Sequence, residues 1–304
     1  LAEATTTLMG MLRIGPRMFY TSFFFAEPHQ ERIISTAGLS RAVGTYINPN
    51  AAAAYLSISF FVLLATPWPT WLRSVFGMWL LAGILGTGSM GALSSTIGSL
   101  VVLLVVHSMV SNQQEATLWG SVIGVGAGML AAMLFIPVVW PSFISRAGFA
   151  TDSRLLALTV GRLPHSLTGR FTRIEEYWPI FKRHPWGTGP DSSASLGLSL
   201  HNDYLAFLFE RGPVGALGWL WMVGATLLTP LKAARLHTNG GRWQVLALGA
   251  GFLASAVNSI AHEVSHFRQL WVLMVFLYAA SRAITARPTI RSLRTAELKG
   301  RGNL

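Results

Sequence analysis

The chain contains no cysteine and few charged residues, and both absences limit what the protein can be. Without cysteine there is no disulfide framework and no thiol chemistry. Charged residues make up only 12% of the 304 positions, which is about half the fraction usual in soluble domains. Hydrophobic residues make up 52%, so the composition indicates an integral membrane protein. No P-loop, dinucleotide fingerprint or Ser-His-Asp order stands out.

The sequence has seven apolar stretches, most of which have lengths near the roughly 17–25 residues that a helix needs to cross a bilayer, while a few are shorter. The sequence therefore predicts an all-α fold, a polytopic transmembrane helix bundle with one large outer loop. The predicted spans are 51–66, 75–88, 92–110, 118–139, 213–229, 244–261 and 267–281. The predicted organisation is an extramembrane or interfacial segment (1–50), four spans within 51–139, a large loop (140–203), three spans within 204–281 and a basic tail (282–304).

Basic residues in the short loops set the predicted orientation, because cytoplasmic loops carry an excess of lysine and arginine. By this rule the 232–242 connector and the 282–304 tail are cytoplasmic. The large loop is also basic, but long loops are translocated largely regardless of their charge. The net charge of +11 is then explained by topology and by contact with anionic lipids, and no nucleic acid is expected. Four polar segments meet at the outer face: 41–50, 86–91, 140–203 and 262–267.

Four sequence motifs occur in these polar segments in a fixed order. They are RAVGTYINPNAAAAYL, LGTGSMGAL, an arginine-rich loop ending in RHPWGTGP, and HNDYLAFLFERGPVG. Together they resemble the O-antigen ligase and polymerase superfamily, from about Arg41 to Tyr278. The most specific part is H-N-x-x-L…G-x-x-G after a P-x-G-x-G turn, formed by His201, Asn202, Leu205, Gly212 and Gly215 after Pro185, Gly187 and Gly189. Family members have more spans than seven, so we expect this chain to be truncated at its N-terminus.

The resemblance implies a multi-pass glycosyltransferase of the bacterial inner membrane whose active face is periplasmic. Its donor would be a glycan on undecaprenyl diphosphate, and its acceptor would be a hydroxyl on lipid A core (a ligase), on a growing polymer (a polymerase) or on a protein. The expected partners are this donor, the acceptor glycan or lipid A core, and membrane lipids. The resemblance implies no cofactor and no metal.

His201 is the candidate catalytic base, because an imidazole is neutral yet basic near neutral pH. Outside its motif it would be read as a capping or interfacial histidine. Arginine suits the diphosphate, because its guanidinium binds phosphate oxygens in pairs. The resemblance gives this role to Arg41 and to Arg170 or Arg173, between which the sequence does not choose. The candidate supporting residues are Asn202, Arg268 and His266.

Met90 departs from the family pattern. The family turn usually reads T-G-S-R-G, but here it reads Thr87-Gly88-Ser89-Met90-Gly91, and a thioether cannot bind phosphate. Either another cation such as Arg268 supplies the charge, or the donor differs, or activity is lost.

Two readings of other functional classes remain open. HEVSH (262–266) matches H-E-x-x-H, which on a helix would place His262 and His266 on one face around zinc with Glu263 as base. An intramembrane zinc metalloprotease is therefore one alternative, although no plausible third ligand follows and Arg268 lies next to the motif. A polysaccharide transporter is the other, but it should carry polar or charged residues inside its spans, which here are nearly free of charge.

Overall fold

The computed structural model describes residues 2, 4, 5, 48–110, 177–190, 192–196, 202–235, 241–260, 262 and 264–283. Within these residues every regular element is a helix, and none is a strand. The prediction of an all-α fold is therefore confirmed for the part of the chain that is described.

Helix α3 (Pro49–Ala65) begins at the turn that the sequence places before the first span. The Asn48 side chain caps it by accepting a hydrogen bond of 2.8 Å from the backbone N–H of Asn50. Pro49 occupies the first turn, where its missing N–H has no helical partner to lose. The local sequence thus sets where this helix starts.

Helices α4 (Thr70–Thr87) and α5 (Met90–Val110) are joined by the short turn that the sequence predicts. Gly88 ends α4 in the left-handed conformation, with φ of 62°. The Thr87 hydroxyl accepts a 3.1 Å hydrogen bond from the Ser89 N–H and so closes the turn. Helix α4 starts before the predicted span 75–88, directly after Pro69, because residues that are too polar to be counted as part of a span can still be helical.

The C-terminal half of the chain contributes the helices that surround the site. They are a short helix over 177–183, α9 (Ser192–Ser195), α10 (Asp203–Arg235), α11 (Gly241–Asn258) and a helix over 268–283. Helix α10 starts ten residues before the predicted span 213–229, because 203–212 is already helical ahead of a kink. This extra segment carries the family motif.

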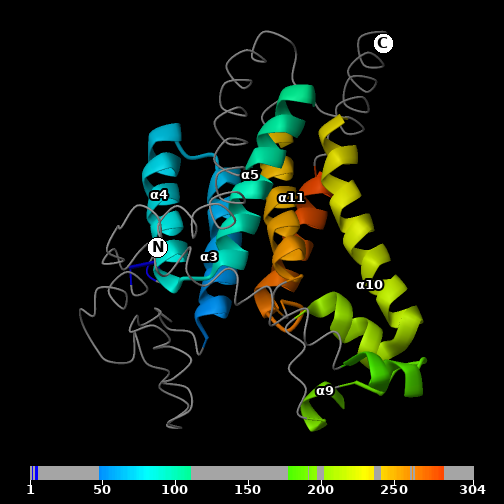
Figure 1. Cartoon of the computed structure of the whole chain (residues 1–304). Helices are drawn as coiled ribbons and strands as arrows, with labels where there is room; N and C mark the ends of the chain where they lie inside the picture. The colour runs from blue at the N-terminus through cyan, green and yellow to red at the C-terminus, as the bar shows by residue number, and fades with distance from the viewer. Residues whose placement is uncertain are drawn as a thin grey trace, which may run out of the picture.

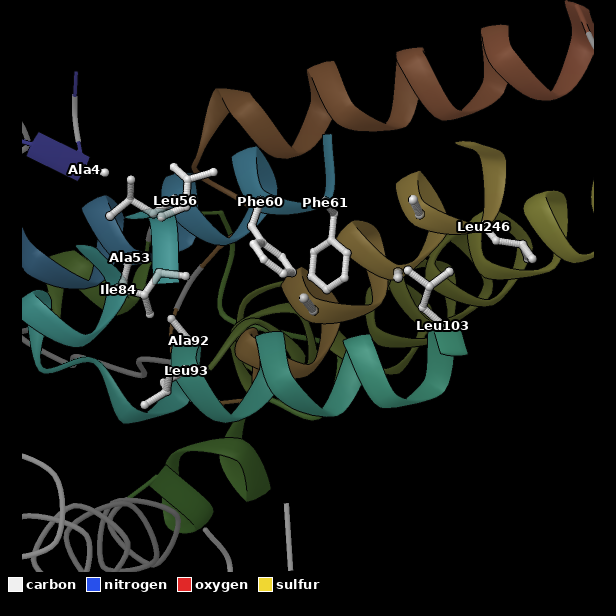
Figure 2. Close-up of a cluster of buried hydrophobic side chains, with 14 of the residues drawn as sticks. Ala4, Ala53, Leu56, Phe60, Phe61, Ile84, Ala92, Leu93, Leu103 and Leu246 are labelled. Carbon is white, nitrogen blue, oxygen red and sulfur yellow. The ribbon is translucent and has the colours of Figure 1, made fainter. Parts of the chain in front are cut away.

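Helix α11 is the centre of the bundle and packs against α3, α5 and α10 (Figure 1). One of its faces joins a core cluster with α3, α4 and α5 (Figure 2), and the other joins a second cluster with α10 and the 268–283 helix. Small residues allow the close approach, since a Cβ at Gly251 would lie 2.9 Å from the Phe61 Cβ. Such small-residue contacts are typical of helices that pack within membranes.

Two of the described helices are long and apolar enough to cross a membrane, namely α5 and α10. Helix α3 is apolar but shorter. Beyond its kink, α10 exposes large apolar side chains such as Leu217, Leu220 and Trp221. The predicted span 118–139 and most of the predicted loop 140–203 lie outside the described residues. The count of seven spans and the domain boundaries therefore stay predictions.

The start of α3, the turn between α4 and α5, the start of α10 and the end of α11 lie at the same end of the bundle (Figure 1). This follows from the alternating direction of successive helices. The described parts of the four polar segments that the sequence brings to one face are thus close to this end.

Candidate active site at the start of α10

Helix α10 bends at Gly212, whose φ and ψ of 67° and −170° are not helical. The next residue, Pro213, has no N–H, so the Phe209 carbonyl loses the donor it would have in a regular helix. The backbone N–H and the hydroxyl of Thr188 donate to this carbonyl instead, at 3.0 and 3.2 Å. The Gly189 N–H donates to the Glu210 carbonyl at 2.9 Å. The P-x-G-x-G turn therefore satisfies the carbonyls that the kink leaves open.

Glycine is needed on both sides of this contact because the two backbones touch. Gly187 has φ of 98°, and a Cβ there would lie 2.6 Å from the Glu210 carbonyl oxygen. A Cβ at Gly212 would lie 2.5 Å from the carbonyl carbon and oxygen of Trp186. The two motifs that the sequence shows as separate patterns are one structural unit.

Gly215 has a different role from the one its sequence pattern suggests. The sequence places it in the bend together with Gly212, but the non-helical conformation is confined to Gly212. A Cβ at Gly215 would lie 2.3 Å from the Arg211 Cβ. The kink brings these two positions together, so a small residue is required beyond it.

Asp203, the first residue of α10, is fully buried. Its Oδ2 accepts hydrogen bonds from the backbone N–H groups of Val264 and Ser265, at 2.8 and 2.9 Å. Its Oδ1 accepts from the Ser265 hydroxyl at 2.6 Å, and its own N–H donates to the Ser259 carbonyl at 3.0 Å. Three donors aimed at one carboxyl group match an acceptor-only carboxylate. Asp203 thus joins the start of α10 to the segment that follows α11.

The neighbours of Asp203 reinforce this junction. The Asn202 side chain caps α10 by accepting from the Leu205 N–H at 3.1 Å. The Tyr204 hydroxyl donates to the Ala256 carbonyl in α11 at 2.9 Å. The residues that directly follow His201 in the sequence are therefore held in place on two helices.

A cavity of about 430 Å³ lies next to this junction. Its walls come from α10 on both sides of the kink and from the segment that begins at Ser265. Its charged and polar aliphatic or imidazole side chains are those of Glu210, Arg211, Ser265 and His266. The Arg211 guanidinium lies 4.7 Å over the Phe207 ring, and that ring stacks on Trp219 at 4.5 Å.

Comparison with protein family models shows which family this part of the chain is similar to. Residues 75–220 match a family model described as O-antigen ligase. This match supports membership of the O-antigen ligase and polymerase superfamily. The match runs from α4 into α10, so it includes the P-x-G-x-G turn, the Gly212 kink and Asp203. No curated protein matches the chain.

The match confirms the family that the sequence motifs indicated. It makes the protein a membrane enzyme of the glycosyltransferase-like ligase and polymerase type. Its substrates are, in general terms, a lipid-linked glycan and an acceptor. The expected truncation of the N-terminus stays a prediction.

Three of the candidate site residues of this O-antigen ligase-like chain are described. Asn202 caps α10, His266 lines the cavity, and Arg268 is exposed at the start of the 268–283 helix. The candidate base and the candidate diphosphate-binding residues lie outside the described residues, and their roles stay predictions. They are His201, Arg41, Arg170 and Arg173.

The described part of the H-E-x-x-H pattern differs from the helix that the motif predicts. His262 lies in a bend and Ser265 and His266 in a turn, so the described part of HEVSH does not form the helix that a zinc protease motif requires. The described residues contain no group of three His, Cys, Asp or Glu placed to share a metal.

Met90 is partly buried and packs against the cluster shown in Figure 2, as expected for an apolar residue.

Asp203 has a structural role that the sequence patterns do not predict. One signal was present: it is the acidic residue in the first turn of an apolar helix. Ionisable residues at such positions are costly unless they have partners. The hydrogen-bond partners of Asp203 are residues 264–265. They lie about sixty positions away, so no local sequence pattern reveals them.

Removing the Asp203 carboxylate is expected to destabilise the protein. Asp203→Ala leaves two backbone N–H groups without their acceptor, at a cost of about 3 kcal/mol, and should speed amide exchange at Val264 and Ser265. Asp203→Asn keeps one oxygen for these donors and should have a smaller effect. Ser265→Ala removes a single hydrogen bond and serves as the mild reference. Equal thermal unfolding midpoints for all three variants in detergent would contradict the assigned role.

Proposed function

We propose that this protein transfers a glycan from undecaprenyl diphosphate to an acceptor hydroxyl at the periplasmic face of the bacterial inner membrane. Membership of the O-antigen ligase superfamily supports the reaction class. The observation that carries the proposal is the hydrogen-bonded contact between the P-x-G-x-G turn and the kink of α10. It joins the two ends of the most specific family motif, which lie before and after His201 in the sequence.

His201 acts as the base in the proposed reaction. The acceptor oxygen attacks the anomeric carbon of the donor sugar while its proton passes to the imidazole. A new carbon–oxygen bond forms as the bond from the anomeric carbon to the phosphate oxygen breaks. The electron pair of that bond leaves with undecaprenyl diphosphate. General base catalysis of this kind accelerates reactions by about 10²–10⁴-fold.

Arg41 and either Arg170 or Arg173 bind the diphosphate in this proposal. The leaving group gains negative charge as the glycosidic bond breaks, and guanidinium groups near its oxygens stabilise that charge. The chain has a large excess of such cations, since its net charge is +11. Because Met90 lacks a charge, these three arginines and Arg268 are the candidates for this role.

Two versions of the proposed function differ in the acceptor. The family description favours a ligase that transfers the glycan to lipid A core, and a polymerase of O-antigen or exopolysaccharide is the second version. The zinc protease alternative is disfavoured by the turn conformation of His266 and its described neighbours. A transporter is disfavoured because the charged side chains of α10 lie before its kink and in its last turn rather than along the segment between them.

Deleting the gene that encodes this protein tests the proposal. If the protein is a ligase, the cells should contain undecorated lipid A core and accumulate lipid-linked polymer. If it is a polymerase, the lipid A core should carry single repeat units. Electrophoresis of extracted envelope glycans distinguishes these results, and unchanged glycans would contradict both versions.

A further inference from the structure

The cavity beside the kink of α10 has an unusual combination of walls. Glu210 supplies acceptors, and Arg211 supplies donors. Trp219, which is buried, and Trp271, which is 43% exposed, supply aromatic surface. The volume of about 430 Å³ lies within the range of roughly 300–1,000 Å³ that is usual for small-molecule sites.

This lining suits a sugar better than a bare phosphate or a lipid tail. Glu210 would repel a phosphate that Arg211 attracts. An alkyl or isoprenoid chain would displace water from both charged groups and offer neither of them a hydrogen bond. A pyranose ring offers hydroxyls to the carboxylate and the guanidinium, while its C–H faces are apolar and pack against indole rings.

The walls are held in place before any ligand binds. The Glu210 carbonyl is tied to the Gly189 N–H at 2.9 Å. On the opposite wall, Asp203 holds Ser265, and the Trp271 indole N–H donates to the Ser265 carbonyl at 2.9 Å. A site that is already formed loses less entropy on binding than one that must be ordered.

We propose that this cavity is a sugar-binding subsite, in which one pyranose ring of a membrane-anchored glycan contacts Glu210, Arg211, His266 and the indole of Trp271. The proposal rests on the proposed function, because it assigns the ring to one of the two substrates of that reaction. The ring belongs either to the donor glycan or to the acceptor glycan, and both present the same chemistry.

Gly218 provides a substitution that fills the cavity without disturbing the fold. It lines the cavity, and a Cβ at this position meets no atom within 4 Å. Gly218→Leu should therefore place its side chain where the sugar ring binds. Gly224→Leu is the matched control, because Gly224 lies on the same helix, also has no atom within 4 Å of a Cβ, and is absent from the cavity lining.

The first test measures transfer by the full chain in nanodiscs. The substrates are a synthetic polyprenyl-diphosphate disaccharide as donor and deacylated lipid A core oligosaccharide as acceptor. Gly218→Leu should raise the KM of one substrate at least about tenfold and leave kcat within a factor of about two. A higher KM for the donor assigns the ring to the donor, and a higher KM for the acceptor assigns it to the acceptor. Unchanged KM values for both substrates, or equal changes in Gly224→Leu, would overturn the proposal.

The second test is independent of transfer. Tryptophan fluorescence is titrated with the core oligosaccharide and, separately, with the disaccharide donor. Saturable quenching by either probe in the wild type that is lost in Gly218→Leu and kept in Gly224→Leu supports the subsite even if no transfer is detected. Absence of transfer with such quenching would overturn the proposed reaction alone. Absence of quenching with both probes would overturn the subsite alone.

Discussion

Replacing His201 with alanine is expected to reduce glycan transfer by about 10²-fold or more, the contribution of a general base. The protein should still insert into membranes and purify as a folded species, because Asn202 and Asp203 hold the start of α10 through hydrogen bonds to Leu205 and Val264. Transfer of a labelled glycan from a polyprenyl-diphosphate donor, measured at saturating acceptor, gives the rate.

His184→Ala is the matched control for this experiment. His184 is an exposed histidine in the chain segment that leads into the P-x-G-x-G turn, and its backbone N–H and carbonyl take part in the hydrogen bonds of that segment. Its replacement should leave the rate within a factor of about two of the wild type, a difference well below the contribution of a general base. Undiminished transfer by His201→Ala would contradict the assignment of His201 as the base.

Alanine at Gly212 or Gly187 is expected to disrupt the contact between α10 and the P-x-G-x-G turn. The left-handed conformation alone costs a residue with a Cβ about 1–2 kcal/mol. The steric clash adds to this, because the new Cβ would lie 2.5 Å from Trp186 in one variant and 2.6 Å from the Glu210 carbonyl oxygen in the other. Both variants should have lower thermal unfolding midpoints, and transfer should fall with them.

Two other glycines separate conformational strain from steric clash. Gly189 has φ of 101°, but a Cβ there meets no atom within 4 Å, so Gly189→Ala should show the strain alone. Gly224 lies in the regular part of α10 with open space around it. Gly224→Ala should therefore be neutral or stabilising by up to about 1 kcal/mol. If Gly212→Ala were as stable as Gly224→Ala, the described contact would be of no consequence for the fold.

The glycine patterns can be seen in the sequence, but the physical reason for them can be seen only in the structure. The P-x-G-x-G and G-x-x-G patterns are visible in one chain, and together with the other motifs they indicated the family. Their meaning depends on a contact between residues about twenty positions apart, since Thr188 and Gly189 bond to the carbonyls of Phe209 and Glu210. Pro213 leaves the Phe209 carbonyl without its helical donor, but the local sequence does not show which residues donate to it instead.

Asp203 illustrates the same limit for an individual residue. Its position at the start of an apolar helix marks it as unusual, and its sequence neighbours His201 and Asn202 drew attention to the segment. The hydrogen bonds that explain it come from Val264 and Ser265. An H-E-x-x-H pattern suggested a helix in that region, whereas its described residues lie in a bend and a turn that present backbone N–H groups to the carboxylate.

The sequence by itself determined the all-α class, the membrane setting, the family and the positions of most described helices. These follow from composition, from apolar runs and from turn residues such as Pro49 and Gly88, all of which act over a few neighbouring residues. Only the tertiary structure decided that Gly187 meets the kink at Gly212, that Asp203 binds the 264–265 segment, and that a cavity opens nearby. Close approach and buried hydrogen bonds between distant segments have no local pattern, because they depend on how the helices pack.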